Sequence, residues 1–369
     1  MKILVLLADL FDRVGGIQSF NRSFAKALDE IADKKGWELT VLVLNDDQTK
    51  NTVKHFPLRK AKYVAFSRNK FNFVVSAFFH ALNSSMLFLG HVNFTPMVFL
   101  LKIFNLPIQI FLMVYGIDVW EKLPILQRIN IKLVNKIISI SNYTKQTSIS
   151  FNSFEESRFL ILPCTLDPDY NNEIVLKSKG ELLLPDGKII LTVSRLAETE
   201  TLKNIDLIIK TLPAILKEVP DAFYVIIGDG SDRARLESLT KNIGVYEKVI
   251  FAGKVTSDLL PSYYNLCDVF ALPSEKEGFG IVFLEAMYYS KPCIGANRGG
   301  IPEVIEDGKS GFLIDPKNIN SLSESMIKLL KDHDLCYSIG KAGKERLENR
   351  FSFKIFRERL EQILLNEKI

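Results

Sequence analysis

Short apolar runs alternate along the chain with longer segments in which apolar residues recur at helical spacing. Short runs of this kind, bounded by turn-forming residues, are typical of strands buried in a parallel sheet. A strand, a helix and a second strand make one β-α-β unit, and repeated units build a doubly wound sheet. The alternation therefore predicts an α/β fold with parallel sheets.

The expected elements fall into two groups along the chain. In the first half we expect one long helix, Ile17–Lys35, and the strands Lys2–Leu7, Leu39–Leu44, Met86–Leu89, Ile108–Met113 and Lys136–Ile140. In the second half we expect the strands Ile189–Val193, Phe223–Ile227, Val249–Ala252, Val269–Leu272 and Cys293–Ala296, with helices at Leu207–Glu218, Asp232–Ile243, Leu259–Asn265 and Ile281–Tyr289. A last helical pattern covers Ser352–Leu365.

The segment between the two groups is rich in turn-forming residues and poor in apolar periodicity. The 369 residues suffice for two domains of ordinary size, so we place the boundary in this segment, near Asp167. Doubly wound sheets bind ligands at the carboxyl ends of their strands. Two such domains would therefore face each other across a deep cleft.

The composition limits the class of protein. With 47% hydrophobic and 24% charged residues, the chain is expected to be globular. The four cysteines lie far apart without a C-x-x-C pair, which favours a reducing cytoplasm over a disulfide framework or a zinc site. The apolar run Ile3–Leu7 is too short for a signal peptide, and Met97–Val114 is interrupted by a lysine, an asparagine and a proline. We therefore expect a cytoplasmic protein.

Positive charge is concentrated in the first half. Residues 1–167 contain 20 basic and 13 acidic residues, whereas residues 168–352 contain 23 and 27. Within 59–73, five basic residues are interleaved with aromatic ones and no acidic residue occurs: Arg59, Lys60, Lys62, Arg68 and Lys70. Such a segment suits anionic lipid headgroups, as in peripheral contact with the inner face of the cytoplasmic membrane, but an ordinary solvated face has the same composition. Nucleic acid is the weakest of the three interpretations, and none is expected as a partner.

A glycine-containing turn follows one predicted strand of the second half. Gly228, Asp229 and Gly230 come directly after Ile227, and glycine lets backbone approach a ligand closely. The dinucleotide-binding fingerprint would need a third glycine where the chain has Arg233, which weakens a dehydrogenase interpretation. By itself, the turn fits a structural role as well as a binding role.

The segment 273–286 contains more potential ligand-binding groups than this turn. Its loop leads to Glu277, and the following Gly-Phe-Gly opens a helix that holds Glu285. The glycines leave the first backbone N–H groups of the helix accessible, and these groups together with the helix dipole attract a diphosphate. Glu277 could then reach an attached sugar, and Glu285 could accept hydrogen bonds from ribose hydroxyls. On spacing alone, a surface loop with solvated glutamates explains the segment equally well.

Two cations and a second pair of glycines are expected near the strand ends. Arg195 follows the strand that ends at Val193, and Lys203 lies near the next helix start. These cations could neutralise a diphosphate leaving group, although exposed surface cations would give the same pattern. Gly15 and Gly16, before the long first helix, are a second place where backbone could close on a phosphate or an acceptor.

Taken together, these residues resemble the retaining glycosyltransferases of family 4, the glycosyl transferases group 1, which have the GT-B fold. The resemblance covers nearly the whole chain, and its most specific feature is the spacing of Glu277 and Glu285 around Gly-Phe-Gly. The other resembling segments include GGIQ (15–18), YGIDVW (115–120), SRLAETETLKN (194–204), GDGSDR (228–233) and GGIPEVIEDGKSGFLI (299–314).

The resemblance implies an architecture and an activity. The fold would be α/β, with two doubly wound Rossmann-like domains facing a deep cleft. Residues 1–167 plus 353–369 would form an N-terminal acceptor-binding domain, and 168–352 a C-terminal nucleotide-sugar-binding domain. The enzyme would move a sugar from a UDP- or GDP-linked donor to a glycan or lipid-linked acceptor, with retention of configuration and without a cofactor. Such reactions build cell-surface polysaccharides.

The resemblance also implies roles for single residues. Glu277 would contact the donor sugar, and Arg195 and Lys203 would bind the diphosphate and stabilise the charge that develops on it. Further donor contacts would come from Gly278, Phe279, Gly280, Glu285, Gly228, Gly15 and Gly16. His91 and Tyr115 would lie on the acceptor side.

The chain departs from the family pattern at Tyr115, where relatives commonly have a histidine near the donor sugar. This keeps two alternatives open: a protein that binds a nucleotide sugar without transferring it, and a sugar-nucleotide epimerase of the same fold. His91 fits a structural histidine at a strand end as well as an acceptor contact. The string at 167–169, Asp-Pro-Asp, matches a metal-binding motif of another glycosyltransferase architecture, but its place between the domains is wrong for that role, and no metal is expected.

Overall fold

The computed structural model of the chain divides into two compact units, Met1–Pro168 with Phe351–Ile369, and Asp169–Arg350. The structure describes residues 1–12, 15–48, 58–167, 170 and 174–366. Two residues of the Asp-Pro-Asp string, Pro168 and Asp169, lie outside the described residues. The predicted roles of the two domains, acceptor binding for 1–167 plus 353–369 and nucleotide-sugar binding for 168–352, stay predictions.

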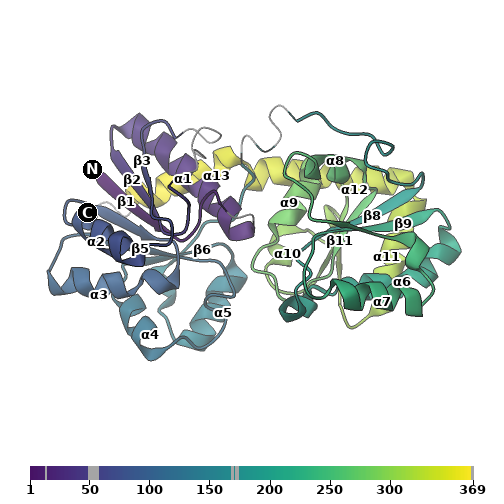
Figure 1. The fold of residues 1–369 in the computed structure, drawn as a ribbon, viewed down its shortest axis with the longest axis horizontal. Coiled ribbons are helices and arrows are strands. Elements are labelled where there is room, and N and C mark those ends of the chain that lie inside the picture. Colours follow the sequence, from purple (N-terminus) through teal and green to yellow (C-terminus); the bar gives the residue numbers. More distant parts are fainter. Residues whose placement is uncertain (13–14, 49–57, 168–169, 171–173, 367–369) are drawn as a thin grey trace. The chain divides into compact units, whose positions relative to one another are not determined.

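The first unit is built on a seven-stranded parallel sheet in the order β3-β2-β1-β4-β5-β6-β7 (Figure 1). The order reverses between β1 and β4, so their carboxyl ends form the switch point at which such sheets bind ligands. The strands are β1 Lys2–Leu7, β2 Glu38–Val43, β3 Lys62–Ala65, β4 Met86–Leu89, β5 Gln109–Val114, β6 Lys136–Ser139 and β7 Phe159–Ile161.

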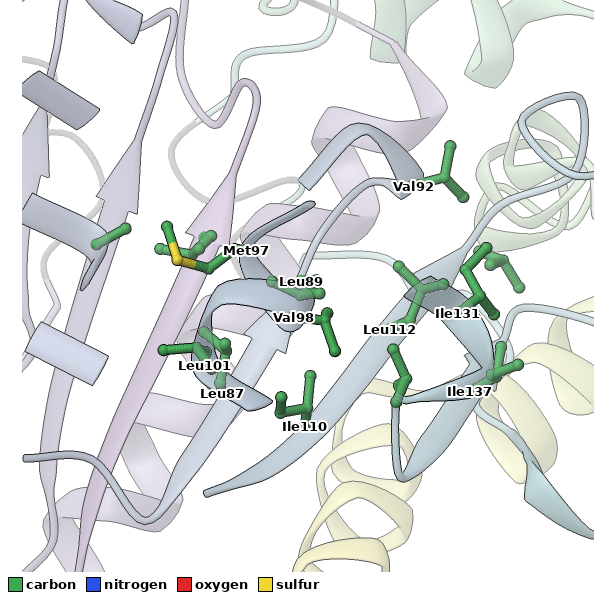
Figure 2. Close-up of a cluster of buried hydrophobic side chains, with 14 of the residues drawn as sticks. Leu87, Leu89, Val92, Met97, Val98, Leu101, Ile110, Leu112, Ile131 and Ile137 are labelled. Atoms are coloured by element: carbon green, nitrogen blue, oxygen red, sulfur yellow. The ribbon is translucent and has the colours of Figure 1, made fainter. Parts of the chain in front are cut away.

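Helices cover both faces of this sheet because its strands are apolar on both sides. They are α1 Gly16–Lys35, α2 Lys70–Ala81, α3 Pro96–Ile103, α4 Ile125–Lys132, α5 Asn142–Asn152 and α13 Phe353–Asn366. On one face, Phe24 of α1 packs against Phe88 of β4, and α13 packs on α1. On the other face, Leu87 and Leu89 of the same strand pack against α3 (Figure 2). The alternation along β4 thus separates the two layers of the core.

The second unit contains a six-stranded parallel sheet in the order β10-β9-β8-β11-β12-β13 (Figure 1). Its order reverses between β8 and β11. The strands are β8 Lys188–Val193, β9 Ala222–Ile227, β10 Val249–Gly253, β11 Val269–Leu272, β12 Cys293–Ala296 and β13 Gly311–Ile314. The helices are α6 Ile205–Glu218, α7 Arg233–Asn242, α8 Leu260–Leu266, α9 Ile281–Tyr288, α10 Ile301–Val304, α11 Ile319–Lys331 and α12 His333–Arg346.

The predicted fold class is confirmed, since both units are doubly wound parallel α/β sheets. Every predicted strand is present with its ends within one residue of those expected. The strands β3, β7 and β13 were not predicted, and neither were helices α2 to α5 of the first unit. Within the described residues, no helix is long and apolar enough to span a bilayer.

Candidate functional site

The second unit brings the predicted donor residues to one edge of its sheet. Arg195 follows β8 and Glu277 follows β11, and these two strands are neighbours at the point where the strand order reverses. The turn that begins at Gly228 follows β9, and Gly299 lies after β12. The four loops therefore meet at the carboxyl edge, which is the usual ligand-binding edge of an open α/β sheet.

Lys203 and Glu277 form an ion pair at this edge. The Lys203 Nζ donates a hydrogen bond to the Glu277 Oε2 at 2.6 Å, and only about a fifth of each side chain is exposed. The two loops are joined a second time through Asn204, whose side-chain amide donates to the carbonyl of Pro273 at 2.9 Å and to the carboxylate of Glu275 at 3.2 Å. The structure thus unites two residues whose shared role was predicted from separate segments.

Arg195 lies in the same group of loops but contacts a different carboxylate. Its guanidinium is 2.5 Å from the Glu200 Oε1, and 77% of the Arg195 side chain is exposed. Glu200 lies in the short 3₁₀ segment that ends at Lys203. One loop therefore supplies both predicted cations, with Lys203 held by Glu277 and the exposed Arg195 held by Glu200.

Close backbone approach explains the Gly-Gly pair after β12. A Cβ on Gly299 would lie 2.5 Å from the carbonyl oxygen of Glu277, and a Cβ on Gly300 would lie 2.2 Å from that of Gly278. The Gly300 N–H donates to the Glu277 carbonyl at 2.8 Å. The pair therefore fixes the backbone from which the Glu277 side chain projects.

The start of α9 also depends on glycine. Gly280 precedes the helix in the left-handed conformation, with φ of 93°, and a Cβ there would lie 2.6 Å from the ring of Phe283. Because Gly280 has no side chain, it leaves the first N–H groups of α9 without a cap of its own. Phe279 is buried, so any contact that it makes with a ligand would come from its backbone.

The Gly228–Gly230 turn packs against the loop that carries Arg195. A Cβ on Gly228, whose φ is 130°, would lie 1.8 Å from the carbonyl oxygen of Ser194, and one on Gly230 would lie 2.2 Å from that of Leu196. The Leu196 N–H donates to the Asp229 carbonyl at 3.2 Å. These contacts give the turn a packing function, and the predicted contact of Gly228 with a donor stays a prediction.

Glu285 is oriented by a buried tyrosine. The hydroxyl of Tyr264, on α8, donates to the Glu285 Oε2 at 2.6 Å. Tyr264 is fully buried and stacks on Tyr289 with ring centroids 6.3 Å apart. Burial raises the pKa of Tyr264 well above its usual range, so the hydroxyl stays a neutral donor at physiological pH. One Glu285 oxygen is therefore fixed, and the carboxylate is held in one orientation.

Three predicted residues of the first unit lie at or next to the carboxyl edge of β1 and β4. Gly15 precedes α1, and Gly16 is its first residue. His91 follows β4, and its Nδ1 accepts a hydrogen bond from the Asn93 N–H at 3.1 Å. Burial lowers the pKa of His91, and the nearby Asp9 opposes this effect more weakly. His91 is therefore neutral at physiological pH and carries its proton on Nε2.

Tyr115 points into the core of the first unit. It is buried, and its hydroxyl donates to the Asn21 Oδ1 of α1 at 2.7 Å. Its ring meets Phe20 edge to face, with centroids 5.5 Å apart. These contacts give Tyr115 a structural role, and its predicted place on the acceptor side stays a prediction.

The basic segment 59–73 is divided between a strand and a helix. Lys62 is the first residue of β3, and Lys70 is the first residue of α2. All five basic residues are exposed, and Lys60 pairs with Asp33 at 2.8 Å. Of the aromatic residues, Phe66 and Phe73 are buried and Phe71 is exposed.

Sequence reasoning missed the residues that hold the site together. Glu200, Asn204 and Tyr264 each contact a predicted residue or its loop. Glu200 and Asn204 lie in the resembling segment 194–204, but no role was predicted for them, and Tyr264 lies in no resembling segment. Gly299 and Gly300 had a signal, because adjacent glycines after a buried strand indicate close backbone approach.

Solved structures identify the fold as GT-B. The Anabaena protein HepE, crystallised with UDP, has a TM-score of 0.79 at 18% identity, and the match covers 99% of this chain and all of that one. Sucrose-phosphate synthase from Thermosynechococcus elongatus has a TM-score of 0.76 at 20% identity and covers 99% of both chains. At these identities, the likeness concerns the fold.

Sequence similarity, unlike similarity of fold, relates the second unit to a particular family model. Residues 176–346, which make up most of the second unit, match the family model "Glycosyl transferases group 1". A relative from Mycobacterium tuberculosis, "GDP-mannose-dependent alpha-(1-6)-phosphatidylinositol monomannoside mannosyltransferase", is 31% identical over 242 residues. The alignment covers 61% of each chain, so this chain spans about three-fifths of that relative's length.

A second relative has a different name. The Bacillus anthracis protein "N-acetyl-alpha-D-glucosaminyl L-malate synthase" is 34% identical over 164 residues, which cover 44% of this chain and 42% of the relative.

Proposed function

We propose that this protein is a glycosyltransferase that moves a sugar from a nucleoside-diphosphate sugar to a glycan or lipid-linked acceptor, with retention of configuration. The observation that carries the proposal is the ion pair between Lys203 and Glu277 at the carboxyl edge of β8 and β11. A cation suited to a diphosphate and a carboxylate suited to sugar hydroxyls are therefore adjacent, beside the start of α9.

In this reaction the protein must stabilise the diphosphate as it leaves the sugar. The bond between the anomeric carbon and the phosphate oxygen breaks, and its electron pair stays with the diphosphate. The acceptor hydroxyl attacks that carbon from the face that the diphosphate leaves, forms the new bond and gives its proton to the departing phosphate oxygen. Lys203 and Arg195 lower the energy of the departing charge, and Glu277 accepts hydrogen bonds from sugar hydroxyls. Because a diphosphate leaves readily, Glu277 has no need to act as a nucleophile.

Two comparisons support a nucleoside-diphosphate sugar as the donor. One relative is named for its dependence on GDP-mannose, and HepE was also crystallised with UDP-glucose. The orientation of Glu285 by Tyr264 adds a carboxylate suited to ribose hydroxyls.

Thermal shifts with a panel of UDP- and GDP-linked sugars identify the donor, because a ligand that binds the folded state raises its stability. With that donor, we expect Glu277→Ala and Lys203→Ala to lower kcat/KM at least about a hundred-fold, as loss of a group that stabilises developing charge does.

The matched control is the ion pair of Lys331 with Glu218, at 2.8 Å in the same unit, whose side chains are about half exposed. Lys331→Ala and Glu218→Ala should leave kcat/KM within about two-fold, because exposed ion pairs contribute little to stability. Full turnover in both Glu277→Ala and Lys203→Ala would refute the assignment of this site.

A protein that binds a nucleotide sugar without transferring it is the second candidate, and the burial of Tyr115 at the usual histidine position favours it. Proton NMR of the donor, alone and with glycan acceptors, separates the possibilities. A transferase releases the nucleoside diphosphate and yields a product whose anomeric coupling matches the donor. A binding protein leaves the donor unchanged, and an epimerase alters the sugar without an acceptor.

A further inference from the structure

Three consecutive helices of the first unit expose large apolar side chains to solvent. More than half of such side chains in the described part of the chain lie on α2, α3 and α4 or at their ends. The exposed fraction reaches 76% for Phe71, 62% for Phe79 and 71% for Leu126. We call this surface the apolar helix face: Phe71, Val74, Val75, Phe79, Leu82, Phe99, Leu100, Ile103, Phe104, Ile125, Leu126, Ile129 and Leu133.

The spacing of these residues places them on one outward side of each helix. In α2, Phe71, Val75 and Phe79 recur every four residues and are exposed, whereas Phe73 and Ala77 face the core. The same arrangement holds in α4, where positions 125, 129 and 133 are exposed and 131 is buried. These helices are therefore apolar on both sides, although a helix at a water-facing surface is normally polar on its outer side.

The three helices form one continuous surface. α3 packs against both α2 and α4, and the three lie along the same side of the first unit in Figure 1. Phe78 of α2 meets Phe104 at the end of α3, with ring centroids 5.4 Å apart. A contiguous exposed apolar area of this kind marks an interaction site.

The charged side chains on α2, α3 and α4 all have the same sign, and basic residues predominate in the chain around them. Residues 59–154 contain eleven basic and two acidic residues, and α2, α3 and α4 contain no aspartate or glutamate. Lys70, Lys102 and Lys132 lie on the three helices, and within the described residues none of them forms an ion pair. Lysine stems can lie along apolar surface while their ammonium groups reach outward.

We propose that the apolar helix face binds the surface of a lipid bilayer that carries anionic headgroups. The apolar side chains enter the boundary between headgroups and acyl chains, and the lysines bind the headgroup phosphates. A second copy of this chain is a poorer partner, because a two-fold contact through this face would set equal positive charges against each other.

The surface reaches the edge where an acceptor is expected. The Gln127 side chain of α4 donates to the Asn93 Oδ1 at 3.0 Å, and Asn93 in turn donates its backbone N–H to His91. Binding to a bilayer would therefore bring the carboxyl end of β4 toward lipid. The link to a lipid-linked acceptor rests on the proposed function, whereas binding to the bilayer does not.

Flotation with vesicles of phosphatidylcholine, with and without phosphatidylglycerol, tests the proposal. We expect the wild-type chain to float with the phosphatidylglycerol vesicles. Phe79→Ser with Ile103→Ser and Leu126→Ser should lower partitioning on the order of a hundred-fold, because three apolar insertions are lost. Lys70→Gln with Lys102→Gln and Lys132→Gln should lower it about five-fold per charge, with the charge effect fading at high salt.

The matched control is Val175→Ser with Leu183→Ser and Tyr337→Ser, three exposed apolar residues of the second unit. It should float like wild type, and circular dichroism should show that every variant is folded. The lysine variant retains all apolar packing, so it tests the proposal even if the apolar variant fails to fold.

The proposal is overturned if the wild-type chain does not float, or if the folded lysine variant floats as well as the control at low salt. It is also overturned if the wild-type chain dimerises without lipid and the apolar substitutions abolish only that dimer, since the face would then bind a second copy. Glu277→Ala should float like wild type, so failure of the proposed function and failure of bilayer binding are distinguishable.

Discussion

At the scale of single residues, burial and hydrogen bonding shift the pKa of Asp118 in opposite directions. Its carboxylate accepts hydrogen bonds from the backbone N–H groups of Tyr115 at 3.0 Å and Gly116 at 2.7 Å, which favour the ionised form. Burial outweighs them and raises the pKa of Asp118 to about 6. The unfolded carboxyl titrates near about 4. The folded state therefore binds the proton more tightly, and stability falls as the pH rises between these values.

Substitution of Asp118 tests whether this residue makes the stability fall as the pH rises. Asparagine keeps the carbonyl acceptor but does not ionise. We expect the free energy of unfolding of Asp118→Asn, relative to wild type, to rise by up to about 3 kcal/mol between about pH 4 and pH 7. Urea unfolding at the two pH values measures the difference. A difference that does not change with pH would show that Asp118 is not responsible for the titration.

The hydroxyl of Tyr115 makes a second residue-scale prediction. Tyr115→Phe removes the donor to the Asn21 Oδ1 and leaves a buried acceptor without that hydrogen bond. We expect a loss of about 1–3 kcal/mol in the free energy of unfolding, with the thermal shift by a nucleotide sugar unchanged. Tyr337→Phe, at an exposed tyrosine, should cost almost nothing. If Tyr115→Phe weakened sugar-nucleotide binding and left stability intact, the side chain would serve the ligand.

At the scale of elements, the turn after β12 should tolerate no side chain at position 299. Gly299 and Gly244 both have left-handed φ angles, 63° and 73°, but a Cβ lies 2.5 Å from backbone at Gly299 and more than 4 Å from any atom at Gly244. We expect Gly244→Ala to cost about 1 kcal/mol from conformation alone. Gly299→Ala should lower the melting temperature more and also weaken the thermal shift by donor, because the clash displaces Glu277. Equal losses in the two variants would contradict this explanation.

The elements also show where sequence reasoning stops. Long apolar runs such as β1 and β8 are recognisable because both of their faces are buried. β13 begins at Gly311, and glycine is unfavourable in a strand, whereas β7 has only three residues, too few to show a pattern. Helices α2 to α4 expose large apolar residues on their outer sides, so they lack the uniformly polar outer face by which a surface helix is recognised.

The candidate site also contains contacts that the sequence predicts and contacts that it does not. Loops that follow buried strands share an edge by topology, so the meeting of Lys203 with Glu277 could be expected once the strands were assigned. The contacts of Glu200, Asn204 and Tyr264 could not be expected, because the sequence does not show which polar group each of these side chains meets in the fold.

At the scale of the whole molecule, each unit has a hydrophobic core of its own, and the last helix belongs to the first unit. Phe356, Leu360 and Leu364 of α13 are buried, and the ring of Phe356 meets Phe20 of α1 with centroids 5.7 Å apart. The stability of a sheet formed by the first residues of the chain therefore depends on residues near its end.

One cavity-forming substitution in each core tests whether the two units unfold independently. Leu360→Ala opens a cavity beside α1 and should cost about 2–5 kcal/mol, so amide hydrogen exchange should quicken in β1 to β6 and α1 while β8 to β13 keep their protection. Leu329→Ala, at a buried position of α11, is the matched change in the other core and should give the opposite pattern. A nucleotide sugar that binds the second unit should slow exchange there in the Leu360→Ala variant as in wild type. If either leucine substitution quickened exchange equally throughout the chain, the two units would unfold as one cooperative body.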